Sequence, residues 1–131
     1  MAHVLIVDDD EDIRFTVRAM LEDLGEHIVS EAPDGPTALA LLRSATERYV
    51  VLLDLLMPNM DGIEVLREVA KDQRLATRHA YILVTVSRRA GSEELSQSLA
   101  LAVPVVPKPF SLDTLLDAVA QASSRLATDT P

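Results

Sequence analysis

Five polar side chains of three kinds follow the apolar segments of this 131-residue chain, at the points where the segments end. They are Asp8 and Asp9 after the first segment, Asp54 after the third, Thr85 after the fourth and Lys108 after the fifth. A carboxylate can accept a phosphoryl group as an acyl phosphate. A hydroxyl can donate a hydrogen bond to a phosphoryl oxygen, and an ammonium group can offer a positive charge to another. If these side chains meet, phosphoryl chemistry at Asp54 is expected.

The three acids would also suit a divalent cation. Carboxylates held close together repel one another, and a bound Mg²⁺ relieves that repulsion. This hard ion takes oxygen ligands and can neutralise charge that develops during phosphoryl transfer. Each residue alone has an ordinary explanation, because acids favour helix N-termini and turns and most lysines are solvated. Only the combination indicates a site.

Five short apolar segments are expected to be strands, because turn residues bound each of them. They span 3–7, 27–32, 50–54, 81–84 and 102–106, and Pro104 inside the last indicates an edge strand. Helices are expected between them, which predicts an α/β domain with a parallel sheet covered on both faces. The carboxyl ends of parallel strands lie at one edge of a sheet, so the polar residues named above would meet there.

Apolar residues at helical spacing predict helices over 13–24, 36–45, 62–69 and 112–122. A further, more polar helix is expected from Ser92, where an acidic first turn follows a capping residue. Gly25 is placed to end the first helix as its C′ residue. The domain is expected to span 1–126, and 127–131 to be a frayed tail.

The composition excludes several classes of protein. Hydrophobic residues make up 48% of the chain and charged residues 25%, as in a single globular domain. The net charge of -9 argues against direct binding of nucleic acid. The absence of cysteine excludes disulfides and thiolate chemistry. No signal peptide and no apolar run of the ~20 residues that a membrane span needs are recognisable, so a cytoplasmic protein is expected.

On these motifs the chain resembles the receiver domains of response regulators in bacterial two-component signalling. The matching motifs are the acid pair after the first strand, the loop DLLMPNMDG over 54–62, Thr85, and Lys108-Pro109-Phe110. The resemblance extends over about 3–126. It implies a flavodoxin-like fold with five helices and five parallel strands in the order 2-1-3-4-5. It also implies a cis peptide between Lys108 and Pro109.

The resemblance also implies a function for each residue of the motifs. Asp54 would accept a phosphoryl group from a sensor histidine kinase or a phosphotransfer protein. Asp8, Asp9, Asp54 and the backbone carbonyl of Leu56 would hold Mg²⁺ or Mn²⁺, and Thr85 and Lys108 would contact the phosphoryl group. The domain would assist its own phosphorylation and dephosphorylation, rather than act as an enzyme on other substrates. A conformational shift would then signal to a downstream protein, which the sequence does not identify.

The chain departs from the family pattern at two positions near these motifs. Receiver domains usually carry Tyr or Phe three residues before the lysine, and here that position is Val105. Val86 follows Thr85, where the family mostly has Ala or Gly. The domain is therefore either a working receiver with an altered output face or a protein-interaction module that does not depend on phosphorylation.

Two other classes of function fit the sequence less well. A phosphohydrolase using Asp54 as nucleophile usually needs a second acid, and Leu56 occupies the obvious place for it. A nucleotide or flavin module would need a glycine-rich loop after the first strand, where this chain has acids. The aromatic content of 3% also leaves little to stack on a flavin.

Overall fold

A computed structural model of the chain describes residues 2–85, 103–108 and 110–128. Its strands are β1 (His3–Val7), β2 (Ile28–Ala32), β3 (Tyr49–Asp54), β4 (Ala80–Thr85) and β5 (Val105–Pro107). Its helices are α1 (Glu11–Ala19), the π-helical η1 (Met20–Leu24), α2 (Gly35–Ser44), α3 (Gly62–Lys71), α4 (Gln73–Arg78) and α6 (Leu112–Thr128). The helix expected from Ser92 lies outside the described residues, as do Val86 and Pro109.

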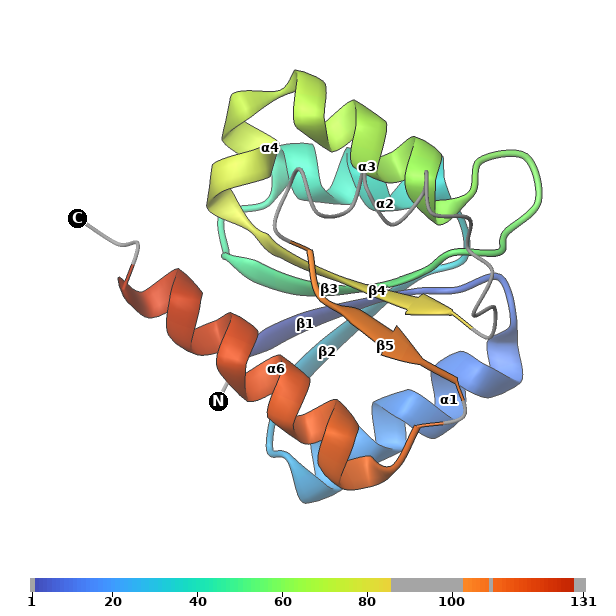
Figure 1. Ribbon diagram of the computed structural model, residues 1–131, viewed down its shortest axis with the longest axis vertical. Helices are drawn as coiled ribbons and strands as arrows, with labels where there is room; N and C mark the ends of the chain where they lie inside the picture. The colour runs from blue at the N-terminus through green and yellow to red at the C-terminus, as the bar shows by residue number, and fades with distance from the viewer. Residues whose placement is uncertain (1, 86–102, 109, 129–131) are drawn as a thin grey trace.

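The five strands form one parallel sheet in the order β2-β1-β3-β4-β5, so the predicted fold class and strand order are confirmed. Figure 1 shows α2, α3 and α4 on one face of the sheet and α1 and α6 on the other. Alternate residues of a strand enter different cores: Leu53 packs toward α2 and α3, whereas Leu52 packs toward α1 and α6. Burial on both faces explains why the central strands are apolar at successive positions.

The first predicted helix ends at Leu24 as expected, but its last turn differs from the prediction. Met20–Leu24 is π-helical, and the Gly25 N–H donates to the Met20 carbonyl over 3.3 Å. The wider turn rotates the end of the helix, and Leu24 is 62% exposed instead of facing the core. The left-handed residue is Glu26, with φ of 55°, and not Gly25, whose φ is -101°. Gly25 is needed for space, because a Cβ there would lie 2.7 Å from Cδ2 of His27.

Other boundaries also differ from the sequence prediction. The last helix, α6, continues to Thr128, past the predicted end at 122 and into the first two residues of the predicted tail over 127–131. The short helix α4 was not predicted, because Leu75 is its one fully buried residue and six residues carry no helical period. Asp72 caps it by accepting from the backbone N–H groups of Arg74 and Leu75. The last strand runs over Val105–Pro107 rather than 102–106, although it is the edge strand that Pro104 indicated.

Candidate functional site

Asp54 ends β3, the central strand of the sheet, and is only 8% exposed. The chain leaves the sheet directly after it. The Leu55 N–H donates to the Val84 carbonyl at 3.0 Å, and the Gly62 N–H donates to the Leu55 carbonyl at 2.9 Å. The Leu56 N–H donates to Oδ1 of Asp54 over 3.4 Å. The loop is therefore held at both ends, with the Asp54 carboxylate at its base.

The residues that close this loop explain the turn signals in its sequence. Asn59 takes up a left-handed conformation with φ of 70°. Asp61 and Glu64 form a capping box that begins α3, with the Glu64 N–H donating to Asp61 over 2.9 Å. A Cβ on Gly62 would lie 2.6 Å from the Asp54 carbonyl oxygen, so only glycine lets the start of α3 approach the end of β3 this closely.

The acids after β1 divide into a cap and a pair that faces Asp54. Asp10 is the cap of α1 and accepts from the backbone N–H groups of Asp12 and Ile13. Asp8, Asp9 and Asp54 each offer a carboxylate oxygen, and these oxygens lie within 4.8 Å of one another. Asp8 is 4% exposed and Asp9 is exposed. Three carboxylates at this spacing, one of them open to solvent, fit a hard divalent cation that keeps some of its water.

Lys108 brings a positive charge to the buried side of the same cluster. Its Nζ lies 3.3 Å from Oδ2 of Asp8 and 3.5 Å from Oδ1 of Asp54. Its backbone N–H donates to the Thr85 carbonyl over 2.7 Å, which ties the end of β5 to the end of β4. Thr85 itself is 3% exposed and follows Val84, the residue paired with Asp54. The structure thus places all five polar strand-end residues at one edge of the sheet, toward which the strand arrows point in Figure 1.

The electrostatics of Asp54 favour a cation or a chemical change at its carboxylate. Burial and, after it, the negative charge of Asp8 raise the pKa of Asp54 to about 6, although the ammonium of Lys108 opposes the shift. A carboxylate that is costly to ionise gains more than an exposed one from a nearby positive charge. A metal ion in this cluster would therefore stabilise the charged form.

Arg14 of α1, which the sequence did not single out, holds the backbone of the acid pair in place. Nη1 of Arg14 donates to the Asp8 carbonyl oxygen at 2.6 Å, and its Nε donates to Glu31 at 3.0 Å. Glu31 also accepts a hydrogen bond from Arg18 at 2.6 Å. The hydrogen bond from Arg18 lowers the pKa of Glu31 most, and the one from Arg14 lowers it as well. The network ties α1 and the edge strand β2 to the loop that carries Asp8. Its one sequence signal is a basic residue between the inward-facing Ile13 and Val17.

A comparison with protein families identifies the domain. The family model of the response regulator receiver domain matches residues 4–120. The chain belongs to this family. It is 33% identical over 123 residues to the chemotaxis protein CheY of Pseudomonas aeruginosa, covering 94% of this chain and 97% of that protein. It is 39% identical to the response regulator MprA of Mycolicibacterium vanbaalenii over 86% of this chain and 46% of that protein, so it spans less than half of MprA.

Solved receiver structures share the fold over most of their length. A CheY-like receiver domain from Methanospirillum hungatei aligns with a TM-score of 0.77 at 28% identity, over 97% of this chain and 95% of that one. The response regulator TrrA of Thermotoga maritima, solved in complex with Mg²⁺-BeF, aligns with a TM-score of 0.78 at 29% identity, over 93% and 99%. The domain thus belongs to a signalling family rather than to a family of enzymes with diffusible substrates.

The positions at which the chain departs from the family pattern are only partly described. Val105 is half-buried, pairs with Leu83 across β4 and β5, and packs against the core on the α2–α3 face. Val86 and the Lys108–Pro109 peptide involve residues outside the described ranges. Leu56, whose carbonyl was expected to be a metal ligand, exposes 57% of its surface in the loop after Asp54.

Proposed function

We propose that this domain takes a phosphoryl group from a histidine kinase, or from a phosphotransfer protein, onto Asp54 in a Mg²⁺-dependent reaction, and then signals to a protein partner. The observation that carries the proposal is the buried Asp54 carboxylate with an ammonium group at 3.5 Å and two further carboxylates beside it. A module kept only for binding has no physical need for three mutually repelling acids at the end of a sheet.

In this reaction a carboxylate oxygen of Asp54 attacks phosphorus, and a P–O bond forms while the donor's P–N bond breaks. The electron pair of that bond leaves with the donor nitrogen. Asp8, Asp9, Asp54 and the Leu56 carbonyl would hold Mg²⁺ or Mn²⁺, which supplies charge neutralisation for the phosphoryl oxygens. The backbone N–H of Leu56 already donates to Oδ1 of Asp54 and so orients the nucleophile.

Lys108 and Thr85 then respond to the new charge. Phosphorylation places a dianionic group where the Lys108 ammonium now contacts two carboxylates, and that ammonium binds a phosphoryl oxygen in their place. The Thr85 hydroxyl donates to another oxygen. Since the Lys108 backbone N–H donates a hydrogen bond to the Thr85 carbonyl, the ends of β4 and β5 move together. Such a movement biases a pre-existing equilibrium between two conformations.

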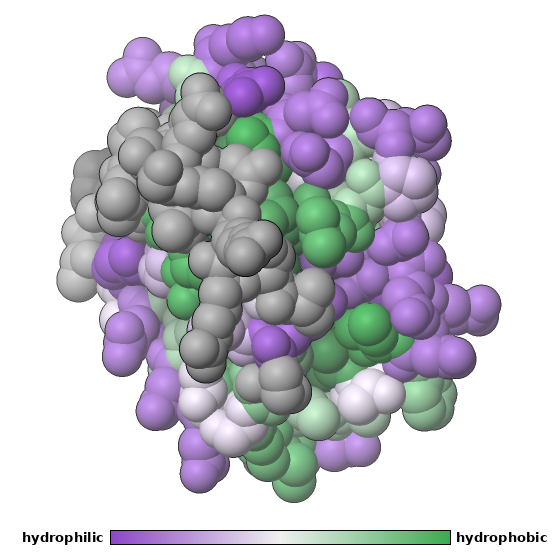
Figure 2. All heavy atoms as spheres, turned by 45° about the vertical axis from the view of Figure 1, so that its right-hand side comes forward, coloured by the Kyte–Doolittle hydropathy of each residue, from purple (hydrophilic) through white to green (hydrophobic). Residues whose placement is uncertain are grey.

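The surface around this edge supports a protein partner rather than nucleic acid. The net charge is -9, and Phe15 of α1 is 73% exposed. In Figure 2, which brings the right-hand side of Figure 1 forward, apolar patches interrupt a mostly hydrophilic surface. Among the helices of the described ranges, none has both the length and the apolar character to cross a bilayer. We place the domain in the cytoplasm, where histidine kinases present their phosphoryl groups.

The second candidate is a protein-interaction module that works without phosphorylation. Val105 favours it, because a small β-branched side chain replaces the ring that other receivers rotate between two positions. Both candidates predict a protein partner, and only the first predicts chemistry at Asp54.

Binding of beryllofluoride distinguishes the two candidates. ¹⁹F NMR of the protein with BeF₃⁻ should show a bound resonance that requires Mg²⁺ and is absent from Asp54→Asn. Asp10→Asn is a matched control, since Asp10 caps α1 and does not join the acid cluster. A bound resonance in Asp54→Asn, or none in the wild-type protein with Mg²⁺, would favour the second candidate.

A further inference from the structure

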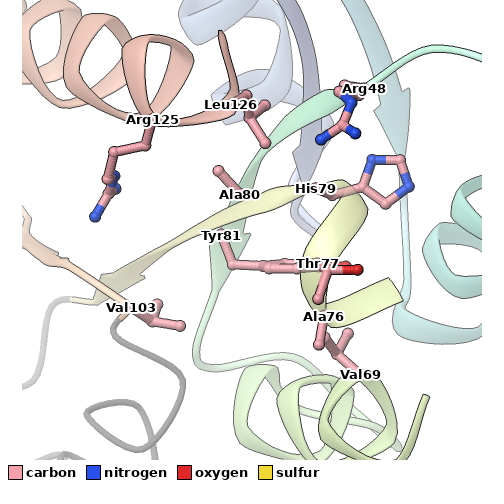
Figure 3. Close-up of a pocket in the computed structure, with 10 residues that line it drawn as sticks. All are labelled: Arg48, Val69, Ala76, Thr77, His79, Ala80, Tyr81, Val103, Arg125 and Leu126. Carbon is pink, nitrogen blue, oxygen red and sulfur yellow. The ribbon is translucent and has the colours of Figure 1, made fainter. Parts of the chain in front are cut away.

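A second hollow lies at the opposite edge of the sheet from Asp54. It has a volume of about 560 Å³ and is bounded by the start of β4, by α4, by the last turns of α6 and by the segment before β3. Figure 3 shows the side chains that line it. This volume is within the range of pockets that bind small molecules. None of the residues assigned above to phosphoryl transfer borders it.

The floor of this pocket is apolar. Val69 of α3, Ala76 of α4, Ala80 and the ring of Tyr81 at the start of β4, and Leu126 of α6 all contribute to it. In Figure 3 the ring of Tyr81 lies along the floor toward α4, between the two sides of the pocket. A ligand must therefore present an apolar part to be held here.

The charged residues known to line the pocket, all from the described part of the chain, are basic. Arg48 and Arg125 stand on two different sides of it, and Figure 3 shows their guanidinium groups on opposite sides of Ala80 and Tyr81. Within the ranges that the structure describes, Arg48 has no hydrogen bond and no ion pair. No Asp or Glu is among the described residues of the lining. Such a cluster is unexpected in a chain with 21 acidic and 12 basic residues.

Two neighbouring arginines strengthen the positive potential. Besides burial, the charges of Arg78, Arg48 and Arg74 lower the pKa of the lining residue His79. Nε of Arg78 is buried without a hydrogen-bond acceptor among the described residues, although its Nη2 donates to the Thr46 carbonyl. An anion in the pocket would offset the mutual repulsion of these guanidinium groups.

The neutral polar groups of the lining already have partners. The Thr77 hydroxyl donates to the Gln73 carbonyl, and the Tyr81 hydroxyl donates to the Leu75 carbonyl. Nδ1 of His79 accepts from the Tyr49 backbone N–H, and its Nε2 lies 3.3 Å from the Leu42 carbonyl oxygen. The guanidinium of Arg48 therefore remains to recognise a ligand, and guanidinium groups bind carboxylate, phosphate and phosphonate oxygens in a planar, two-pronged arrangement.

We propose that this pocket binds a small organic anion, with its oxyanion head on Arg48 and its apolar body on the floor formed by Val69, Ala76 and Tyr81. Two features fix the chemistry of the ligand. The arginines select a negative charge, and the apolar floor selects against inorganic phosphate or a sugar phosphate without an apolar part. The site stands apart from phosphorylation, so its occupancy does not require a charge at Asp54.

The probe for the test is phenylphosphonate, which has an oxyanion head on an aromatic ring and cannot donate a phosphoryl group. Titration followed by ¹H–¹⁵N NMR should give saturable shifts at the amides of Thr77, Ala80 and Tyr81. Phenylmethanol, which keeps the ring without the charge, should bind at least about tenfold more weakly, as expected for loss of a charge-assisted hydrogen bond. Asp54→Asn should bind phenylphosphonate as the wild-type protein does, which separates this site from the proposed phosphoacceptor.

Variants of Arg48 decide whether the assigned anchor is correct. Arg48→Gln should weaken phenylphosphonate binding by about tenfold, and Arg48→Lys by less, since a lysine keeps the charge without the planar fork. Lys71→Gln removes one positive charge from an exposed ion pair with Glu68 and should leave the affinity unchanged. Equal affinity for phenylmethanol, an unchanged affinity in Arg48→Gln, or shifts confined to Asp8, Asp9 and Lys108 would overturn the proposal.

Discussion

His79 anchors the amino end of β3, the strand that ends in Asp54, and its contacts require a neutral ring. The ring is buried, and its Nδ1 accepts a hydrogen bond from the Tyr49 backbone N–H over 3.0 Å. Nε2 lies 3.3 Å from the Leu42 carbonyl oxygen, to which it can only donate. A proton on Nδ1 would remove the acceptor that Tyr49 needs. Because His79 links Tyr49 of β3 to Leu42 of α2, loss of the Tyr49 hydrogen bond in acid should weaken the attachment of β3 to α2.

The magnitude follows from the pKa of this ring. Burial lowers the pKa of His79 from 6.5 to about 4, with the Leu42 carbonyl opposing the shift and the charges of Arg78 and Arg48 adding to it. Each pKa unit corresponds to about 1.4 kcal/mol. At a pH where His79 is protonated in the unfolded chain but neutral in the folded protein, the free energy of unfolding is therefore lower by up to about 3 kcal/mol. Because the unfolded chain binds the proton first, the stability is complete above pH 6.5 and is lost as the pH falls toward 4.

Urea unfolding followed by circular dichroism measures this loss, with His79→Gln as the reference at each pH. Between pH 7.5 and pH 5.2 the wild-type protein should lose about 2 kcal/mol more of its unfolding free energy than the variant loses. The glutamine does not titrate, and carboxyl groups of ordinary pKa stay ionised over most of this interval. EDTA in all samples removes any contribution from bound metal. Parallel pH dependences for the two proteins would refute the assignment of a neutral, buried His79.

Three further predictions concern the acid cluster and the groups that support it. Gly62→Ala should lower the free energy of unfolding by about 2 kcal/mol in urea titrations, because its Cβ would lie 2.6 Å from the Asp54 carbonyl oxygen; no loss would show that α3 can move away from β3. Arg14→Gln should weaken Mg²⁺ binding about tenfold in calorimetry, because it removes the hydrogen bond that holds the Asp8 carbonyl oxygen. Arg18→Gln should change the Mg²⁺ affinity little. Equal effects of the two substitutions would assign Arg14 a general structural role. Mg²⁺ should raise the melting temperature of the wild-type protein more than that of Asp54→Asn, and an equal rise would place the ion elsewhere.

Sequence reasoning went furthest where a residue type had a single physical use. An uninterrupted apolar run such as 50–53 can be satisfied only when both faces of a strand are buried, which predicted β3 and the parallel sheet around it. Gly62 and Asp61 likewise marked the turn into α3. Parallel topology then required the polar residues at the strand ends to meet, and the structure brings Asp8, Asp54 and Lys108 into contact.

The features that escaped prediction depend on contacts between distant segments. The π-helical turn over Met20–Leu24 forms where the chain must reach β2, and no local signal distinguishes it from an α-helical turn. Arg14 resembled any helical arginine until the fold placed Glu31 and the Asp8 carbonyl on either side of its guanidinium. The basic pocket is lined by Arg48 and Arg125, which are far apart in the chain and border the same pocket only in the folded protein.

The most direct test of the account is the intact mass of the protein after incubation with acetyl phosphate, with and without Mg²⁺, measured beside Asp54→Asn. The account predicts one phosphoryl adduct on the wild-type protein in the presence of Mg²⁺ and none on the variant or in EDTA. No adduct on the wild-type protein with Mg²⁺, or an equal adduct on Asp54→Asn, would contradict the assignment of Asp54 as the phosphoacceptor.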